Sequence, residues 1–208
     1  MEEKINTIKK WLGTGSINIF GLPMSGKDTV GIRLAELIDA RFLSSGMIIR
    51  AAENETNKKM TANGELIPTN IFYDLVLPYF EREDLKDFPL ILSSIGRWYG
   101  EEKEVLKVAE GAGHPIKAAV ILDVSEDDIA RRWETAKVLG DRGMREDDKD
   151  PDVFRKRITE FRTKTLPVLK TYKDLGLLVN VRADMTRDEV FNALVEKLYL
   201  LAKNSITN

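Results

Sequence analysis

Residues 21–29 bring two glycines, a lysine and a hydroxyl together between an apolar run and a helical pattern; they read Gly-Leu-Pro-Met-Ser-Gly-Lys-Asp-Thr. Gly21 and Gly26 allow turn conformations that a Cβ obstructs. Such a turn points backbone N–H groups at an anion beside the positive end of a helix dipole. Lys27 is placed to reach outer phosphates, and Thr29 to help hold Mg²⁺. The stretch therefore predicts a polyphosphate site.

The spacing from Gly21 to Lys27 fits the phosphate-loop pattern, but Asp28 follows the lysine where Ser or Thr is usual. The hydroxyl arrives one position later, at Thr29. An ordinary strand-to-helix turn with a surface lysine is the alternative. The apolar run at 17–20 and the helical spacing after the stretch favour the phosphate loop.

Strand and helix patterns alternate along the rest of the chain. Apolar runs predict strands at 17–20, 41–44, 88–95, 118–124 and 177–181. Helical spacing and caps predict helices at 4–12, 27–39, 46–53, 69–80, 100–110, 125–136, 151–175 and from 186 onward. Thr69 or Asn70 is expected to cap the fourth of these, and Pro167 to kink the long one. We predict one α/β domain over 1–208, a parallel five-stranded sheet with helices on both faces.

Composition narrows the class of protein. The chain has 208 residues, 43% of them hydrophobic, and a net charge of −2, so it offers no basic stripe for nucleic acid. It has no cysteine and one histidine, His114, which we read as an exposed loop residue. No apolar stretch is long enough to span a membrane, and the first residues do not resemble a signal peptide. We expect a cytoplasmic, monomeric protein without nucleic-acid or membrane partners.

Arginines recur where strands end or loops begin. They are Arg50, Arg97, Arg132, Arg142, Arg145 and Arg157. Guanidinium groups bind phosphate oxygens bidentately and stay charged. Phosphoryl transfer depends largely on positioning and on stabilising charge. Any one of these arginines taken alone is more simply a solvated surface charge.

With these motifs in order, nearly the whole chain resembles the adenylate kinase family of nucleoside monophosphate kinases. Besides the phosphate loop, the similar segments are Ser45-Gly-Met-Ile-Ile-Arg50, Gly64-Glu-Leu-Ile-Pro68, Leu92-Ser-Ser-Ile-Gly-Arg97, Arg145-Glu-Asp-Asp148, Arg157, Thr165-Leu-Pro167 and Tyr172. The resemblance implies a P-loop kinase core with a small helical acceptor-binding insertion at 45–72. It also implies a short lid at 133–149, without cysteines for a zinc-bearing version.

The resemblance also implies roles for individual residues. Those implied for ATP are Gly21, Pro23, Met24, Ser25, Gly26, Lys27, Asp28, Thr29 and Arg132, with Arg132 stacking on the donor base. Those implied for the acceptor are Ser45, Gly46, Arg50, Leu66, Ile67, Arg97 and Glu101. The implied catalytic set is Lys27, Arg97, Arg142, Arg145 and Arg157, with Thr29 at Mg²⁺.

Several positions depart from the family pattern. Met24 and Asp28 replace glycines of the loop, and Ser93 stands where the family has an acid that organises metal-bound water. Asp28 is a candidate to replace that acid. The family's second lid arginine falls on Ala136, which leaves Lys137 or Arg142 for its role.

The acceptor-base position is the most consequential departure. The family's glutamine there is Glu101, and a carboxylate only accepts hydrogen bonds. It suits guanine or cytosine donors better than adenine. We expect transfer of the ATP γ-phosphoryl group to a nucleoside monophosphate, AMP by family frequency. A catalytically weakened nucleotide-binding protein and a P-loop kinase for a small non-nucleotide acceptor remain open.

Overall fold

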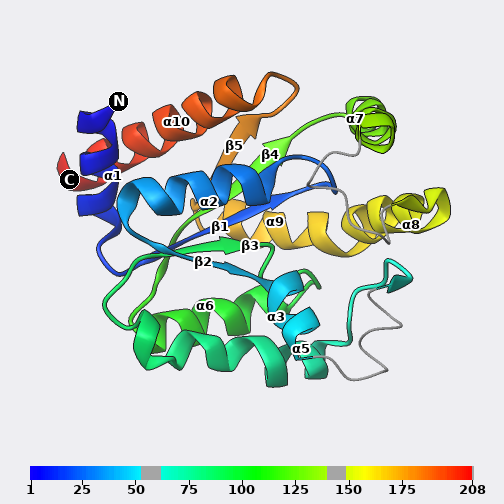
Figure 1. The fold of residues 1–208 in the computed structure, drawn as a ribbon. Coiled ribbons are helices and arrows are strands. Elements are labelled where there is room, and N and C mark those ends of the chain that lie inside the picture. The colour runs from blue at the N-terminus through cyan, green and yellow to red at the C-terminus, as the bar shows by residue number, and fades with distance from the viewer. Residues whose placement is uncertain (53–61, 140–148, 208) are drawn as a thin grey trace.

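The computed structural model describes residues 1–52, 62–139 and 149–207. Its sheet has five parallel strands in the order β2-β3-β1-β4-β5 (Figure 1). They are β1 (Ser16–Gly21), β2 (Arg41–Ser44), β3 (Leu90–Ser93), β4 (Ile116–Asp123) and β5 (Leu178–Arg182). The five-stranded parallel sheet predicted from the sequence is confirmed.

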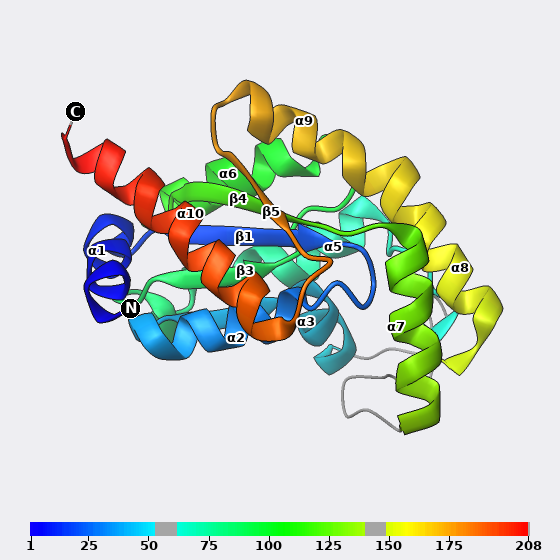
Figure 2. The same cartoon turned by 90° about the horizontal axis from the view of Figure 1, so that it is seen from above.

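Helices cover both faces of this sheet (Figures 1 and 2). One face carries α1 (Glu2–Leu12), α2 (Lys27–Ile38) and α10 (Arg187–Thr207). The other carries α3 (Ser45–Ala51), α5 (Thr69–Val76), α6 (Glu101–Gly111) and α9 (Leu166–Asp174), with 3₁₀ turns at Leu77–Glu81 and Glu83–Leu85. Beyond one end of the sheet lie α7 (Glu126–Leu139) and α8 (Pro151–Glu160). No helix within the described ranges is long and apolar enough to cross a membrane.

The central strand, β1, contributes buried side chains to the hydrophobic core on each face of the sheet. All six residues of β1 are buried. Ile17 and Ile19 pack in the core beneath α1, α2 and α10, whereas Phe20 packs in the core beneath α5, α6 and α9. Because successive strand side chains point to opposite faces, one short apolar run supplies both cores.

The predicted helix starts at Ser125 and Thr186 are confirmed as capping interactions. The Asp128 N–H donates to Ser125 Oγ at 3.1 Å. The Thr186 N–H donates to Glu189 Oε2 at 3.0 Å, and the Glu189 N–H donates back to Thr186 Oγ1 at 3.4 Å. These pairs satisfy N–H groups that a helix start otherwise leaves without partners.

The long helix expected over 151–175 is interrupted, although not at Pro167 itself. A π-helical turn at Phe161–Thr165 joins α8 to α9, and Pro167 lies in the first turn of α9. Proline has no N–H and crowds the carbonyl four residues earlier, and a wider turn accommodates both effects.

Two smaller expectations were wrong. Thr69 does not cap α5; its hydroxyl donates to Glu101 Oε1 at 2.8 Å, and α5 begins after Pro68 without a side-chain cap. His114 is wholly buried, with Nδ1 2.8 Å from the Thr14 carbonyl. The turn before β4 lies against the start of β1, where Ser16 Oγ donates to the His114 carbonyl. This packing buries the imidazole ring of His114.

A buried amide holds the turn that follows β3. We call residues Ser94–Trp98 the β3 exit turn. Asn18 of β1 donates through Nδ2 to the Ile95 carbonyl at 2.7 Å, and its Oδ1 accepts the Ile95 N–H at 3.2 Å. Asn18 is wholly buried, so no water can replace these bonds if they are lost.

Asn18→Leu should therefore lower the free energy of unfolding by more than an ordinary hydrophobic substitution in the core does. Leaving the Ile95 N–H and C=O buried without partners is expected to cost about 3 kcal/mol in urea unfolding. The control Ile19→Val, on the same buried strand, should cost about 1 kcal/mol. Equal losses in the two variants would contradict the anchoring role of the amide.

Candidate phosphoryl-transfer site

The phosphate loop connects the end of β1 to the start of α2. Gly26 has φ +87°, a conformation that side chains rarely adopt, and α2 begins at the next residue, Lys27. A Cβ on Gly21 would lie 2.4 Å from Ser25 Oγ, so the loop closes tightly over its first glycine. The two glycines thus occupy positions where the backbone requires them.

Most of this loop lines a cavity of about 980 Å³. From the predicted ATP and catalytic sets, the cavity brings together Pro23, Met24, Ser25, Gly26, Lys27, Asp28, Thr29, Arg132 and Arg157. The two arginines come from α7 and α8, more than 100 positions further along the chain. The same cavity is therefore lined by the phosphate loop and by two arginines from distant segments of the chain.

The loop between β5 and α10 also lines the cavity and was missed from the sequence. The loop contributes Asp184, Met185 and Thr186, and the start of α10 contributes Arg187 and Glu189, while α7 adds Asp128, Arg131 and Thr135. A signal was available, because the Thr186–Glu189 capping box marks a helix starting just after the last strand. Ligands of open parallel sheets bind at the carboxyl ends of the strands.

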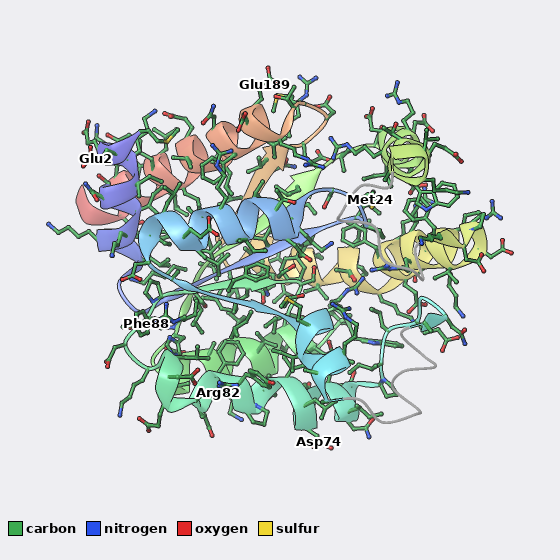
Figure 3. The ribbon with its side chains drawn as sticks, viewed as in Figure 1. Glu2, Met24, Asp74, Arg82, Phe88 and Glu189 are labelled. Atoms are coloured by element: carbon green, nitrogen blue, oxygen red, sulfur yellow. The ribbon has the colours of Figure 1, made fainter. Side chains whose placement is uncertain are left out.

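Met24 adopts a backbone conformation that usually belongs to glycine. Its φ is +62°, and it lines the cavity at the end of the sheet that faces α7 (Figure 3). A residue with a Cβ held in the left-handed region carries strain of about 1 kcal/mol. The loop thus has a glycine-like backbone at this position although the residue is methionine.

Arg132 fastens the loops around the cavity to one another. Its Nη1 lies 3.4 Å from the carbonyl oxygens of Met24 and Ser25, and its Nη2 donates to the Ala183 carbonyl. The guanidinium group therefore connects the phosphate loop to the loop after β5. The resemblance implies that Arg132 stacks on the donor base, and this side chain is tethered to both loops.

Asp28 contacts the residue at the end of β3. Ser93 Oγ donates to Asp28 Oδ1 at 2.5 Å. The structure thus places this carboxylate of α2 directly beside the position where the family resemblance calls for an acid. Within the described part of the chain, no group of three or more acidic or histidine side chains gathers to hold a metal.

The residues predicted for the acceptor do not line this cavity, and several of them contact the β3 exit turn. Ser45, at the start of α3, donates through Oγ to the Ser94 carbonyl at 2.9 Å. Arg50 of the same helix folds back, so that a Cβ on Gly46 would lie 3.0 Å from its Nη1. The exit turn itself carries Arg97. The two arginines predicted to grip the acceptor phosphate thus come from two segments joined by a hydrogen bond.

The segment at 64–68 connects the β3 exit turn to α8. Leu66 donates its N–H to Glu160 Oε2 at 3.2 Å, and Trp98 Nε1 donates to the Ile67 carbonyl at 3.1 Å. A Cβ on Gly64, where φ is +73°, would lie 3.0 Å from Arg157 Cγ. Arg157 therefore lines the cavity while its stem contacts the segment at 64–68, which is predicted to bind the acceptor.

Glu101 lies at the first position of α6 and is only 2% exposed. Its Oε2 accepts the backbone N–H groups of Arg97 at 2.8 Å and Trp98 at 3.0 Å, and its Oε1 accepts the Thr69 hydroxyl. Removal from water raises the pKa of the Glu101 carboxyl above its usual value, against the opposing effect of these hydrogen bonds. The sequence identified the position but not these three bonds.

Arg142 and Arg145 lie outside the described residues, as does most of the predicted lid at 133–149. Part of the predicted insertion at 45–72, residues 53–61, also lies outside them. At the described start of the lid segment, Trp133 is buried and stacks on Phe154, with ring centroids 5.1 Å apart. Trp133 therefore packs α7 against α8.

A parallel sheet with a phosphate loop at its central strand, and basic side chains converging on that loop, defines a P-loop phosphotransferase. A gluconokinase from Sinorhizobium meliloti 1021 shares the fold, with a TM-score of 0.65, 18% identity, and coverage of 93% of this chain and 96% of that chain. No family model matches the sequence.

Curated relatives specify the family. An adenylate kinase of Bartonella bacilliformis is 30% identical over 193 residues, which cover 86% of this chain and 99% of the relative. One of Agrobacterium fabrum is 31% identical over 183 residues, which cover 84% and 92%. The chain belongs to the adenylate kinase family.

The raised pKa of Glu101 predicts how its charge affects stability. An acid whose pKa is higher in the folded than in the unfolded protein favours folding when protonated and disfavours it when ionised. Its stabilising contribution is complete below the usual value of 4.5 and is lost as pH rises through the folded pKa. Glutamine is neutral, so Glu101→Gln should raise the melting temperature at pH 7, and the gain should shrink as pH falls toward 4.5.

Glu104→Gln removes a charge from a more exposed position of the same helix and serves as the control. A pH-independent difference between wild type and Glu101→Gln would contradict the prediction.

Proposed function

We propose that the protein transfers the γ-phosphoryl group of ATP to a nucleoside monophosphate, with AMP as the acceptor. One observation supports it most. Arg132 and Arg157, from separate helices, line the same cavity as the phosphate loop. Family membership supports the nucleotide acceptor, because the curated relatives are adenylate kinases.

The chemistry follows from the positions of these groups. N–H groups at the start of α2, together with Lys27, hold the β- and γ-phosphates of ATP. An oxygen of the acceptor phosphate attacks the γ-phosphorus, the bond to the β-phosphate oxygen breaks, and ADP leaves. Arg157 neutralises charge on the transferring group from the side of the acceptor segment. Arg50 and Arg97 hold the acceptor phosphate.

Loss of Lys27 should therefore abolish most activity. Lys27→Ala is expected to lower kcat/KM for ADP formation by about a hundredfold or more, since it removes charge stabilisation from the transferring phosphate. The measurement is a coupled ADP assay with ATP and each of AMP, GMP, CMP and UMP. Lys103→Ala, an exposed lysine of α6, is the control and should match the wild type.

Each outcome of this assay has a distinct meaning. ADP formation with one or more monophosphates supports the proposal, and strict preference for AMP supports its acceptor. Nucleotide binding without turnover indicates the catalytically weakened alternative, which the strained Met24 favours. The same assay with a small non-nucleotide acceptor tests the third alternative, and turnover only with that acceptor would reject the monophosphate kinase assignment.

The cavity also offers groups suited to Mg²⁺, which when bound polarises the phosphates of ATP and neutralises their charge. Thr29 and Asp28 lie together at the start of α2 and line the cavity. A carboxylate next to a triphosphate is repulsive unless a cation lies between them. Mg²⁺ typically binds one or two carboxylates together with substrate phosphates. Ser93 holds Asp28 in position through its hydroxyl.

Asp28→Asn should weaken the response to Mg²⁺ specifically. The Mg²⁺ concentration that half-saturates ATP binding, measured by calorimetry, is expected to rise about tenfold. Ser93→Ala removes only the positioning hydrogen bond and should have a smaller effect. An unchanged Mg²⁺ dependence in Asp28→Ala would exclude this role.

A further inference from the structure

The β3 exit turn has an unusual backbone and many anchors. Ser94 has φ +52° and Gly96 has φ +77°, so two of its five residues lie in the left-handed region. Such a turn persists only where surrounding contacts determine it. Contacts from β1 and α3 fix its first half, at Ser94 and Ile95. Its second half, which carries Arg97, depends on Glu101.

Glu101 holds this second half through the backbone. One carboxylate oxygen accepts the N–H groups of Arg97 and Trp98. The other accepts the hydroxyl of Thr69, the first residue of α5. With these bonds made and 2% of the residue exposed, the carboxylate faces protein groups. The predicted acceptor insertion is therefore hydrogen-bonded to this site near both ends, through Ser45 at the exit turn and Thr69 at Glu101.

We propose that Glu101 is a positioning residue that fixes Arg97 for the acceptor phosphate and does not read the acceptor base. The inference rests on the proposed function, because the role of Arg97 does. It removes the expectation that a carboxylate here selects guanine or cytosine. It also predicts that losing Glu101 weakens every acceptor equally.

Glu102 provides a matched control. It is wholly buried, and its carboxylate accepts the Gly100 N–H at 2.6 Å and the Thr171 hydroxyl at 2.8 Å. It therefore shares the helix start and the burial of Glu101 but bonds neither Arg97 nor Thr69. Any general effect of removing a buried glutamate from α6 should appear in Glu102→Ala as well.

The test uses calorimetric binding of AMP, GMP, CMP, UMP and ribose 5-phosphate, a probe with the phosphate but no base, to the full chain. Glu101→Ala should weaken all five by the same factor, about tenfold for a loosened charged contact. Glu102→Ala should leave all five affinities unchanged. Glu101→Gln should stay within about twofold of wild type, because its amide can keep all three bonds while Thr69 turns to accept.

A base-reading role gives the opposite pattern. Glu101→Ala would then spare ribose 5-phosphate, and Glu101→Gln would reorder the four bases; either result overturns the proposal. If Glu101→Ala fails to fold, Thr69→Val removes one of the three bonds and should weaken all five probes by about two- to threefold. Unequal effects on the five probes, or none, would count against the proposal.

Amide hydrogen exchange separates this inference from the proposed function. The Arg97 and Trp98 N–H groups should exchange slowly in the wild type and in Glu102→Ala, and at least about tenfold faster in Glu101→Ala. If the wild type binds no monophosphate, the proposed function fails and the exchange result alone decides the anchoring. Equal protection in all three proteins would overturn it.

Discussion

All five strands run parallel, so their carboxyl ends lie along one edge of the sheet, and five segments of the site begin there. The phosphate loop follows β1, α3 follows β2, the exit turn follows β3, α7 follows β4, and the loop into α10 follows β5. Segments far apart in sequence thus meet without long connections. A bound polyphosphate requires such convergence, because its charge is spread over many oxygens that no single segment can reach.

Convergence alone does not fix the loops that carry the charged groups. Polar side chains anchor the backbone of these loops. Asn18 and Glu101 contact the backbone of the exit turn, while Arg132 contacts the backbone of the loops around the cavity. Bonds to backbone groups fix a loop without depending on its side chains. Since these anchors are buried or partly buried, losing one leaves polar groups without water to replace it.

The start of α6 shows how buried carboxylates that act as anchors are stabilised. Glu101 and Glu102 are consecutive buried acids, a combination that desolvation disfavours. Both lie in the first turn, where the helix dipole favours negative charge, and both accept N–H groups from the loop ahead of the helix. Burial still prevails at Glu101, whose carboxyl pKa is raised. The start of α6 thus stabilises the loop ahead of it.

Local patterns in the sequence determined the sheet, the helix starts and the phosphate loop. The reason is that turn glycines, capping boxes and apolar periodicity act over a few neighbouring residues. The sequence also singled out Arg132 and Arg157, although only through the resemblance to a family.

Only the tertiary structure decided which partner each polar group meets. Glu101 stands where a base contact was expected, yet its oxygens bond Arg97, Trp98 and Thr69. His114 was predicted to be an exposed loop residue, and it lies in a loop but is buried. Such pairings depend on segments that fold together from distant parts of the chain, and no spacing within one segment records them.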